Sequence, residues 1–509
     1  MAKATTTTIS RCAAALSGAL LPLSFAPFSW WPIAIICCAV LAITLRNTRS
    51  RQAFMVCALF GAGLYGTGAS WVYVSIHQYG QASVLLATLL TALFAISLGA
   101  LFALPIFLYA GIHLRNRWDH NPIRSSLVFA AIWVLGEWFR GWFLTGFPWL
   151  YLGYGFIDTW LAGWAPLGGV LFISGIVAFS GALLGHTLLI WHRHQQLRAM
   201  RMITLLLSTL WLGGHFLQEK TWTQAAATTP LTVALVQPNN PVLTKWGQNT
   251  LPTILADIRE KTLTLGDHDL IVWPESAIPA LQGSVQNWLT ELDDLASPQQ
   301  TALIAGIPNR SDKGEYFNSV IGLGLATGSY QKRHLVPFGE YVPLESLLRG
   351  AIAFFDLPMS SFSSGPDQQT LIKIGPYKVA SAICYEIAYS APIAADARHA
   401  NLLLTISNDT WFGDSLGPHQ HLQIARFRAL ETGKPLLRAT NDGITAIIDE
   451  HGGVIVKLPR LVADVLSGHI MPRRGATPYS NWGELPVVYA CLLIFLWALG
   501  LSRLLKKPS

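Results

Sequence analysis

The chain has 509 residues, of which 52% are hydrophobic and only 12% are charged. A soluble domain usually carries about 25% charged residues, so the composition excludes an ordinary soluble protein over the whole length. The net charge of +7 does not favour a nucleic-acid-binding protein, because the basic residues mostly flank apolar blocks. Residues 12–218 and 485–502 are strongly apolar, whereas 219–480 has the composition of a globular domain. The composition therefore predicts a membrane protein that carries one polar domain.

Eight apolar stretches approach the length of about 20 residues that a membrane-spanning helix needs. They are residues 12–27, 30–46, 54–73, 83–112, 125–139, 166–190, 202–217 and 485–502. Basic residues gather in the alternate loops 46–52, 113–124 and 191–201 and in the C-terminal tail, whereas the loops 24–32 and 68–81 carry no Lys or Arg. Because basic loops stay in the cytoplasm, both termini are predicted to be cytoplasmic and the polar domain to lie outside. The first stretch could instead be a cleaved signal peptide.

These stretches divide the chain into three predicted parts. Residues 1–218 form an N-terminal membrane domain of about seven transmembrane helices, and 219–480 form one polar domain on the outer side of the membrane. Residues 481–509 form a C-terminal transmembrane helix with a basic cytoplasmic tail.

The polar domain alternates between short apolar runs and helix-like stretches. Strands are predicted at 231–237, 269–276, 301–308, 317–324, 377–385, 401–409 and 443–449, and helices at 247–264, 285–296 and 417–432. The strand runs end at Pro, Gly, Asn or Asp, which is typical of buried strands. The alternation predicts a layered α/β domain, in which ligands gather beyond the strand ends.

Cys384 is the one cysteine of the polar domain, since the other five lie in apolar stretches. Outside the cytoplasm cysteines tend to be oxidised in pairs. A lone cysteine there is either an inert core residue or a reactive thiol, and on this observation alone both interpretations stay open.

Chemically active residues follow the predicted strands. Glu275 ends "IVWPES", Cys384 and Glu386 end "ASAICYE", and Lys332 and Glu340 lie in "YQKRHLVPFGEYVP". Glu275 could be a general base, Lys332 could lower the pKa of the thiol and bind an oxyanion, and Cys384 could carry an acyl group as a thioester. Each also has a plainer interpretation, such as a helix cap for Glu275 or a solvated charge for Lys332. Spacing alone does not bring them together.

The order of "WPES", "HLVPFGE" and "CYE" resembles the nitrilase superfamily. A fuller set of motifs resembles the apolipoprotein N-acyltransferase family: "SWVYVSI" (70–76), "RGWFLTGFPWL" (140–150), "IVWPESAIP" (271–279), "KRHLVPFGEYVPLE" (332–345), "AICYE" (382–386) and "LTISNDTWFG" (404–413). This resemblance implies a membrane α-helical bundle of about eight transmembrane helices and a nitrilase-like α-β-β-α sandwich domain. It also implies a catalytic triad and a set of supporting or substrate-binding residues. The triad is Glu275, Lys332 and Cys384, and the supporting set is Glu340, Tyr385, Glu386, Trp246, Asn318 and Trp411.

The resemblance further implies a ping-pong reaction in the bacterial inner membrane. A membrane phospholipid donates an acyl chain to the cysteine, and the acceptor is the α-amino group of the N-terminal diacylglyceryl-cysteine of an apolipoprotein. No metal or cofactor is expected. The alternatives are a membrane-tethered amidase that hydrolyses small amides and a non-enzymatic module that binds exported lipoproteins. Few ionisable residues in the spans argue against a transporter.

Other features carry two interpretations each. Residues 347–366 could form a lid that dips into the bilayer or a buried helix with a loop. Glu137 is a functional candidate because it lies in an apolar stretch, but pairing with Arg140 is the simpler interpretation. His419 and His421 are interpreted as solvated or capping side chains.

Overall fold

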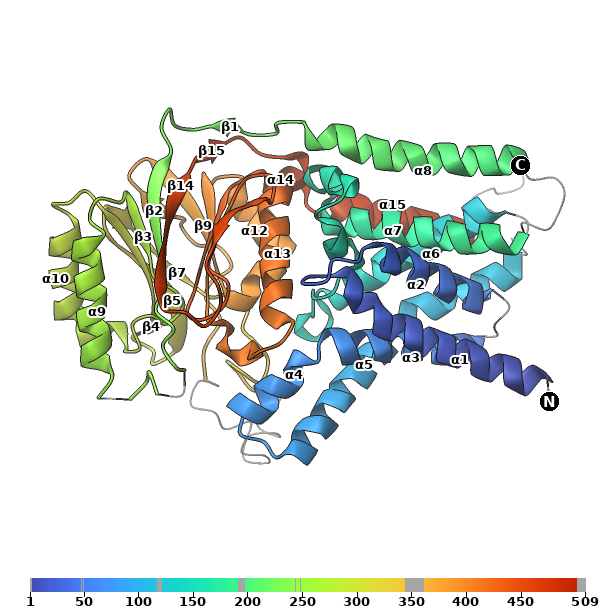
Figure 1. Cartoon of the computed structure of the whole chain (residues 1–509), viewed down its shortest axis with the longest axis horizontal. Helices are drawn as coiled ribbons and strands as arrows, with labels where there is room; N and C mark the ends of the chain where they lie inside the picture. The colour runs from blue at the N-terminus through green and yellow to red at the C-terminus, as the bar shows by residue number, and fades with distance from the viewer. Residues whose placement is uncertain are drawn as a thin grey trace. The chain divides into compact units, whose positions relative to one another are not determined.

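The computed structural model describes residues 2–46, 48, 50–116, 121–190, 197–242, 244–247, 249–343 and 361–500 (Figure 1). The chain forms two compact units. The first, a helical unit, comprises Met1–Tyr73, Val84–Lys220 and Trp482–Ser509, and the second comprises Val74–Ser83 and Thr221–Asn481. Val74–Ser83 thus belongs to the second unit although most of that unit follows much later in the sequence.

The helical unit is built from long apolar helices. They are α1 (Ala2–Leu20), α2 (Pro32–Leu45), α3 (Ser50–Gly68), α5 (Val84–Asn116), α6 (Pro122–Arg140), α7 (Ala165–Ile190), α8 (Leu197–Gln218) and α15 (Leu485–Ala498), and α4 (Trp71–Val74) begins here. Glycines allow close contact between them: a Cβ atom on Gly61 of α3 would lie 2.7 Å from the Cα atom of Gly99 in α5. Such small-residue contacts are typical of helices that pack in a membrane.

Two helical segments among the described residues are long and apolar enough to cross a membrane, at Val84–Ile112 and Trp160–Leu189. A bent pair, Arg51–Gly68 with Trp71–Tyr79, makes a third if it counts as one span. The described residues therefore support two or three of the eight predicted spans. The helices α2 and α15 have 14 residues each, or about 21 Å at 1.5 Å per residue, which is less than the bilayer core of about 30 Å.

Glu137 and Arg140 lie at the end of α6 and do not form the predicted pair. Glu137 accepts hydrogen bonds from the indole of Trp133 at 3.0 Å and from the amide of Leu152 at 2.7 Å. Arg140 donates to the carbonyl oxygen of Trp149 at 2.7 Å. No ion pair joins the two side chains in the described part of the chain. Both instead attach the segment that follows α6 to the helix.

The second unit contains two large β-sheets. One has the order β14-β2-β3-β4-β5-β7 and the other β13-β12-β11-β10-β9-β8-β6. The strands of the first sheet are β2 (Leu231–Gln237), β3 (Leu270–Val272), β4 (Ala302–Arg310), β5 (Tyr316–Gly324), β7 (Ser329–Gln331) and β14 (Asp464–Ile470). Those of the second are β6 (Ala326–Thr327), β8 (Ile372–Ile374), β9 (Tyr377–Ile383), β10 (Leu402–Ser407), β11 (Leu436–Thr440), β12 (Ala446–Ile448) and β13 (Val454–Lys457). A short ribbon joins β1 (Gln224–Ala225) to β15 (Arg473–Arg474).

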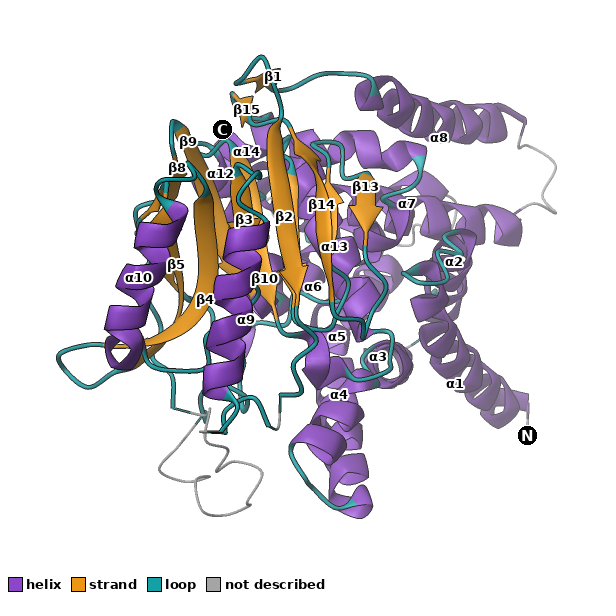
Figure 2. Cartoon of the chain, turned by 60° about the vertical axis from the view of Figure 1, so that its left-hand side comes forward, coloured by secondary structure: helices purple, strands orange, loops and turns teal. Residues whose placement is uncertain are grey.

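Helices cover the outer face of each sheet. They are α9 (Leu251–Thr264) and α10 (Gln286–Ala296) on the first sheet, and α12 (Ser390–Ala397) and α13 (Gly417–Thr432) on the second; the short α14 (Pro478–Trp482) follows β15. Figure 2 shows both helices in front of the first sheet, with α10 over β5 and α9 between β4 and β2. The layers therefore run helix, sheet, sheet, helix, as the nitrilase-like sandwich was expected to do.

The alternation of side chains along the strands creates two cores. Val233 and Leu235 of β2 point between the sheets and pack with Leu404 of β10, whereas Ala234 and Val236 point out toward α9 and α10. Successive residues of a strand face opposite sides, so a run that is apolar at every position must be covered on both faces.

The predicted elements agree in part with the structure. Strand β2 and helix α13 have the predicted bounds, and the predicted strand at 269–276 ends early because Pro274 follows β3. The other strands of the two large sheets, among them β7, β8, β11, β13 and β14, were not predicted. β11 contains Arg438, which interrupts the apolar pattern although its side chain is fully buried.

Candidate active site

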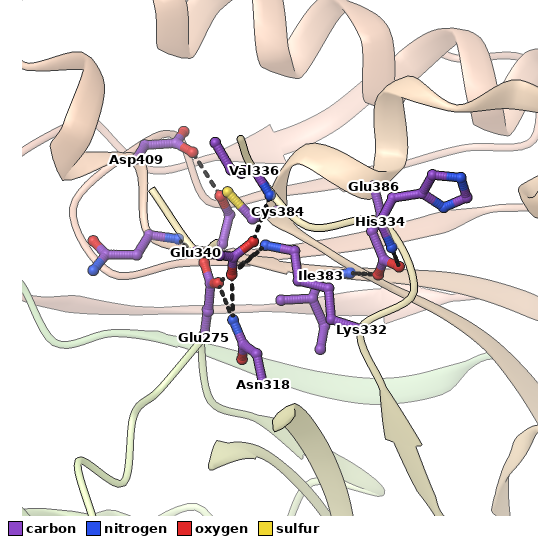
Figure 3. A network of polar contacts seen from close by, with 12 residues as sticks. Glu275, Asn318, Lys332, His334, Val336, Glu340, Ile383, Cys384, Glu386 and Asp409 are labelled. Carbon is purple, nitrogen blue, oxygen red and sulfur yellow. Dashed lines mark hydrogen bonds and ion pairs between the residues drawn. The ribbon is translucent and has the colours of Figure 1, made fainter. Parts of the chain in front are cut away.

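Loops at the ends of neighbouring strands bring the candidate residues together (Figure 3). Glu275 follows β3, Cys384 follows β9, and Asp409 follows β10. Because β9 and β10 are parallel neighbours, their carboxyl ends lie at one edge of the sheet. Asn318 comes from β5 and Lys332 from the end of β7, where the Lys332 amide donates to the carbonyl oxygen of Asn318 at 2.9 Å.

Glu275 and Lys332 share one buried polar network with Glu340. The Lys332 ammonium donates to Glu340 at 2.8 Å and lies 3.7 Å from Glu275 Oε1. The side-chain amide of Asn318 bridges the two carboxylates, at 2.7 Å from Glu275 and 3.0 Å from Glu340. The backbone amide of Asn408 donates to the second oxygen of Glu275 at 2.8 Å. Both carboxylate oxygens of Glu275 thus accept a hydrogen bond that orients them.

Cys384 follows the last residue of β9 and begins the short 3₁₀ helix Cys384–Ala388, so the chain turns sharply at this residue. Its φ angle of +54° is in the left-handed region that side chains other than glycine rarely adopt. Strain of this kind persists only where the surroundings enforce it, and it gathers at functional sites. Figure 3 shows the thiol of Cys384 close to the side chains of Glu340, Glu275 and Lys332.

The charges of the network set its protonation. Burial and, to a smaller extent, the charge of Glu275 raise the pKa of the Cys384 thiol to about 12, against the lowering effect of Lys332. Lys332 therefore acts on the thiol in the predicted direction, but burial outweighs it and the resting side chain is a thiol. Burial also raises the pKa of Glu275, against the lowering effect of Lys332. Burial alone would lower the pKa of Lys332, but Glu340 and Glu275 raise it, so this residue stays an ammonium.

Glu386 connects the turn at residues 384–388, the cysteine turn, to the loop at residues 332–340, the lysine loop. One of its oxygens accepts from the amides of Arg333 at 2.6 Å and His334 at 3.0 Å, and the other accepts from the amide of Ile383 at 2.8 Å. The hydroxyl of Tyr330 lies 3.0 Å from both oxygens. Glu386 is therefore placed to hold the two loops in register and does not belong to the Lys332 network itself.

A second buried network lies behind the cysteine, and sequence reasoning missed it. His421 is fully buried, with Nε2 at 3.1 Å from the carbonyl oxygen of Cys384 and Nδ1 at 3.0 Å from Asp409. Since a carbonyl oxygen only accepts, Nε2 carries a hydrogen. Arg438 and Ser407 donate to Asp409 at 2.6 and 2.7 Å. The interpretation of His421 as a solvated or capping side chain is wrong, because α13 packs this face against the cysteine turn.

The other predicted residues lie around the network. Tyr385 follows the cysteine and packs edge-on against Tyr389, with ring centroids 5.4 Å apart. Trp411 contacts Tyr79 at 5.7 Å between rings and accepts a hydrogen bond from Ser75 through its carbonyl oxygen. Val74–Ser83 is therefore packed beside the loop that follows β10. Trp246 is half-buried, and the Lys245 ammonium lies 5.6 Å from the centre of its ring.

Only the end of the predicted lid is visible. Of 347–366, the residues up to 360 lie outside the described part of the chain. Phe362 donates its amide to the carbonyl oxygen of Glu340 at 2.9 Å, and Gly365 donates to that of Lys332 at 2.8 Å. The described end of this segment is thus attached to the lysine loop.

Among the described residues, no group of three or more His, Cys, Asp or Glu side chains is arranged to hold a metal ion. The site consists of a buried thiol, a carboxylate held by two donors, and an ammonium paired with a second carboxylate. Such a set can deprotonate a thiol, stabilise an oxyanion and carry a covalent acyl group.

Comparisons with known proteins match both parts of the chain. Residues 17–183 match the family described as "Apolipoprotein N-acyltransferase N-terminal domain", and residues 232–479 match "Carbon-nitrogen hydrolase". The apolipoprotein N-acyltransferase of Pseudomonas syringae pv. tomato is 45% identical over 495 residues, covering 96% of each chain. That of Vibrio cholerae is 39% identical over 494 residues, covering 93% of this chain and 94% of the relative.

Among solved structures, the nitrilase-superfamily protein Nit3 of Saccharomyces cerevisiae is 18% identical, with a TM-score of 0.37, and the match covers 49% of this chain and 93% of that one. The relatives at 39–45% identity extend over nearly the full length, through the helical unit and the sandwich alike. The chain therefore belongs to the apolipoprotein N-acyltransferase family.

Proposed function

We propose that this protein transfers an acyl chain from a membrane phospholipid to the α-amino group of the N-terminal diacylglyceryl-cysteine of apolipoproteins. The observation that carries the proposal is the convergence of Glu275, Lys332 and the strained Cys384 at one edge of the sandwich. Family membership supports the choice of substrates, since relatives of nearly the same length are named apolipoprotein N-acyltransferases. The active-site residues are part of the proposal.

In the first half-reaction Cys384 takes the acyl chain. Glu275 accepts the thiol proton as the sulfur attacks the carbonyl carbon of the donor ester, and the Lys332 ammonium stabilises the oxyanion. The bond between this carbon and the glycerol oxygen then breaks. The proton held by Glu275 passes to that oxygen, and the lysophospholipid leaves with the acyl group bound to sulfur as a thioester.

In the second half-reaction an amine replaces the lysophospholipid. The α-ammonium of the acceptor loses one proton to solvent, and the neutral nitrogen attacks the thioester carbon. Glu275 accepts a second proton from this nitrogen and returns it to the departing Cys384 sulfur. The products are an amide and the free thiol, so the enzyme regains its starting protonation.

The proposed topology follows from the apolar stretches and the basic loops. Eight spans would place 219–480 in the periplasm and both termini in the cytoplasm, in the bacterial inner membrane. The two or three candidate spans among the described residues support a membrane location. The phospholipid donor and the diacylglyceryl-modified acceptor are both anchored in that membrane by acyl chains, so a site held at its outer face suits them.

Intact-mass spectrometry tests the proposal. The purified protein is incubated with a dipalmitoyl phospholipid and no acceptor, beside Cys384→Ala. We expect a mass gain of one acyl chain that hydroxylamine removes, that Cys384→Ala lacks, and that a diacylated lipopeptide discharges. A folded wild type that gains no mass would overturn the proposal and favour the amidase alternative, for which small amides are the next substrates.

A further inference from the structure

A second lysine, Lys245, approaches the turn that carries the proposed base. It precedes Trp246 in the segment between β2 and α9, and its side chain is only 5% exposed. Its ammonium donates to the carbonyl oxygen of Ser276 at 3.4 Å. Ser276 directly follows Glu275 and has a φ angle of +49°, so the turn that carries the proposed base is itself strained.

The charges of the site show why a second cation is needed. Glu275 and Glu340 are two buried carboxylates, and Lys332 lies nearer to Glu340, at 2.8 Å against 3.7 Å. With Lys332 alone, the three groups would carry a net negative charge in a buried place, which favours protonation of one carboxylate. A protonated Glu275 could not accept the proton of Cys384. A cation beside Glu275 removes this obstacle.

Among the described residues, Lys245 can supply this second positive charge near Glu275. It interacts electrostatically with Glu275 and also with Asp442, which lies in the loop after β11. The Asp409 carboxylate, the other acid behind the cysteine, is already paired with Arg438 at 2.6 Å. A buried ammonium with one long hydrogen bond is costly unless it is compensated by opposite charge. The neighbouring carboxylates supply that charge.

We propose that Lys245 is a positioning residue that keeps Glu275 ionised and fixes the strained turn that carries it. The inference rests on the proposed role of Glu275 as the base in acyl transfer. Burial lowers the pKa of Lys245 to about 8 against the raising effect of Glu275, so the lysine keeps its charge at neutral pH and loses it as the pH rises above about 8. Lys245 thus supports the base over the lower part of the pH range.

The test is the pH dependence of thioester formation in a single turnover. Wild type, Lys245→Met, Lys245→Gln and Lys245→Arg are mixed with dipalmitoylphosphatidylglycerol in detergent micelles, and the acylated mass is followed between about pH 5 and pH 9. Removing an opposite charge near a carboxylate raises its pKa by about 1–3 units. The acid limb should therefore move up by at least about one pH unit in Lys245→Met and Lys245→Gln, which is about a tenfold loss of rate on that limb.

Lys245→Arg should keep the wild-type acid limb because it keeps the charge. Lys245→Gln keeps a donor for the Ser276 carbonyl, and it decides the matter if Lys245→Met does not fold. The matched control is Lys434→Met, because Lys434 is also buried and donates to a carbonyl oxygen, that of Arg473 at 2.9 Å. Burial lowers the pKa of Lys434 to about 8, as it does for Lys245. We expect a wild-type profile for it.

The outcomes separate this inference from the proposed function. If the wild type forms no thioester, the proposed function fails. If the wild type forms one and the acid limb of folded Lys245→Gln stays unmoved, the inference about Lys245 is wrong. The same conclusion follows if Lys434→Met shifts the limb as far as Lys245→Gln does, because the effect would then be general to buried lysines.

Discussion

Replacing Glu275 by Gln should slow the first half-reaction as well as the second. Burial raises the pKa of the Cys384 thiol to about 12, so at pH 7 only about one molecule in 10⁵ would hold a thiolate without help from a base. The substitution also removes a negative charge that raises this pKa. The thiolate is therefore more abundant in the variant, and the rate should fall by less than about 10⁵-fold. A general base typically contributes a factor of about 10²–10⁴. We expect a loss in this range, equivalent to about 3–5 kcal/mol in the barrier.

The assay is thioester formation in a single turnover, measured by intact mass at pH 7 with a phospholipid and no acceptor. Glu260→Gln on the exposed face of α9 is a control for the removal of a carboxylate. Because Asn318 and the Asn408 amide both donate to Glu275, a Gln side chain must turn its NH₂ toward one of them, so the thermal unfolding of each variant is compared as well. Acylation of folded Glu275→Gln within about tenfold of wild type would refute the role of Glu275 as the base for the thiol.

Three further predictions concern the groups that hold the site. Glu386→Gln turns an NH₂ group toward a backbone amide, and should lower the free energy of unfolding by about 1–3 kcal/mol, seen as a lower Tm together with slower acylation; an unchanged Tm would contradict the interpretation. Arg438→Met leaves the buried Asp409 carboxylate without its charged partner and should lower the free energy of unfolding by about 3–5 kcal/mol. Adding Asp409→Asn to this variant should restore part of the Tm, and no recovery in the double variant would argue against the pair. Burial raises the pKa of Asp442 to about 6, so the folded state binds its proton more tightly and stability falls as the pH rises from about 4 to about 6. Asp442→Asn should therefore gain up to about 3 kcal/mol relative to wild type at pH 8 and nothing at pH 3, and equal gains at both pH values would exclude this cause.

Local patterns in the sequence were sufficient for the layered domain and for the candidate residues. The strand at 231–237 and the helix at 417–432 have the predicted bounds, because a short apolar run with β-branched residues and a stretch bounded by Pro418 and Gly433 are strong local signals. The motifs around Glu275, Lys332 and Cys384 likewise stand out as short stretches of the chain. Their meaning still came from resemblance, since spacing in a sequence does not measure distance in a fold.

Only the tertiary structure decided how these residues meet and how they are protonated. The 3.7 Å approach of Lys332 to Glu275 and the high pKa of Cys384 arise from burial and from partners far away in the sequence. For the same reason β11 was missed: Arg438 looks like a surface residue until Asp409 neutralises it inside the protein. His421 was predicted to be solvated, whereas in the structure α13 directs its side chain toward the carbonyl oxygen of Cys384. Charge and hydrogen bonding in a buried site depend on non-local neighbours, which a linear pattern does not contain.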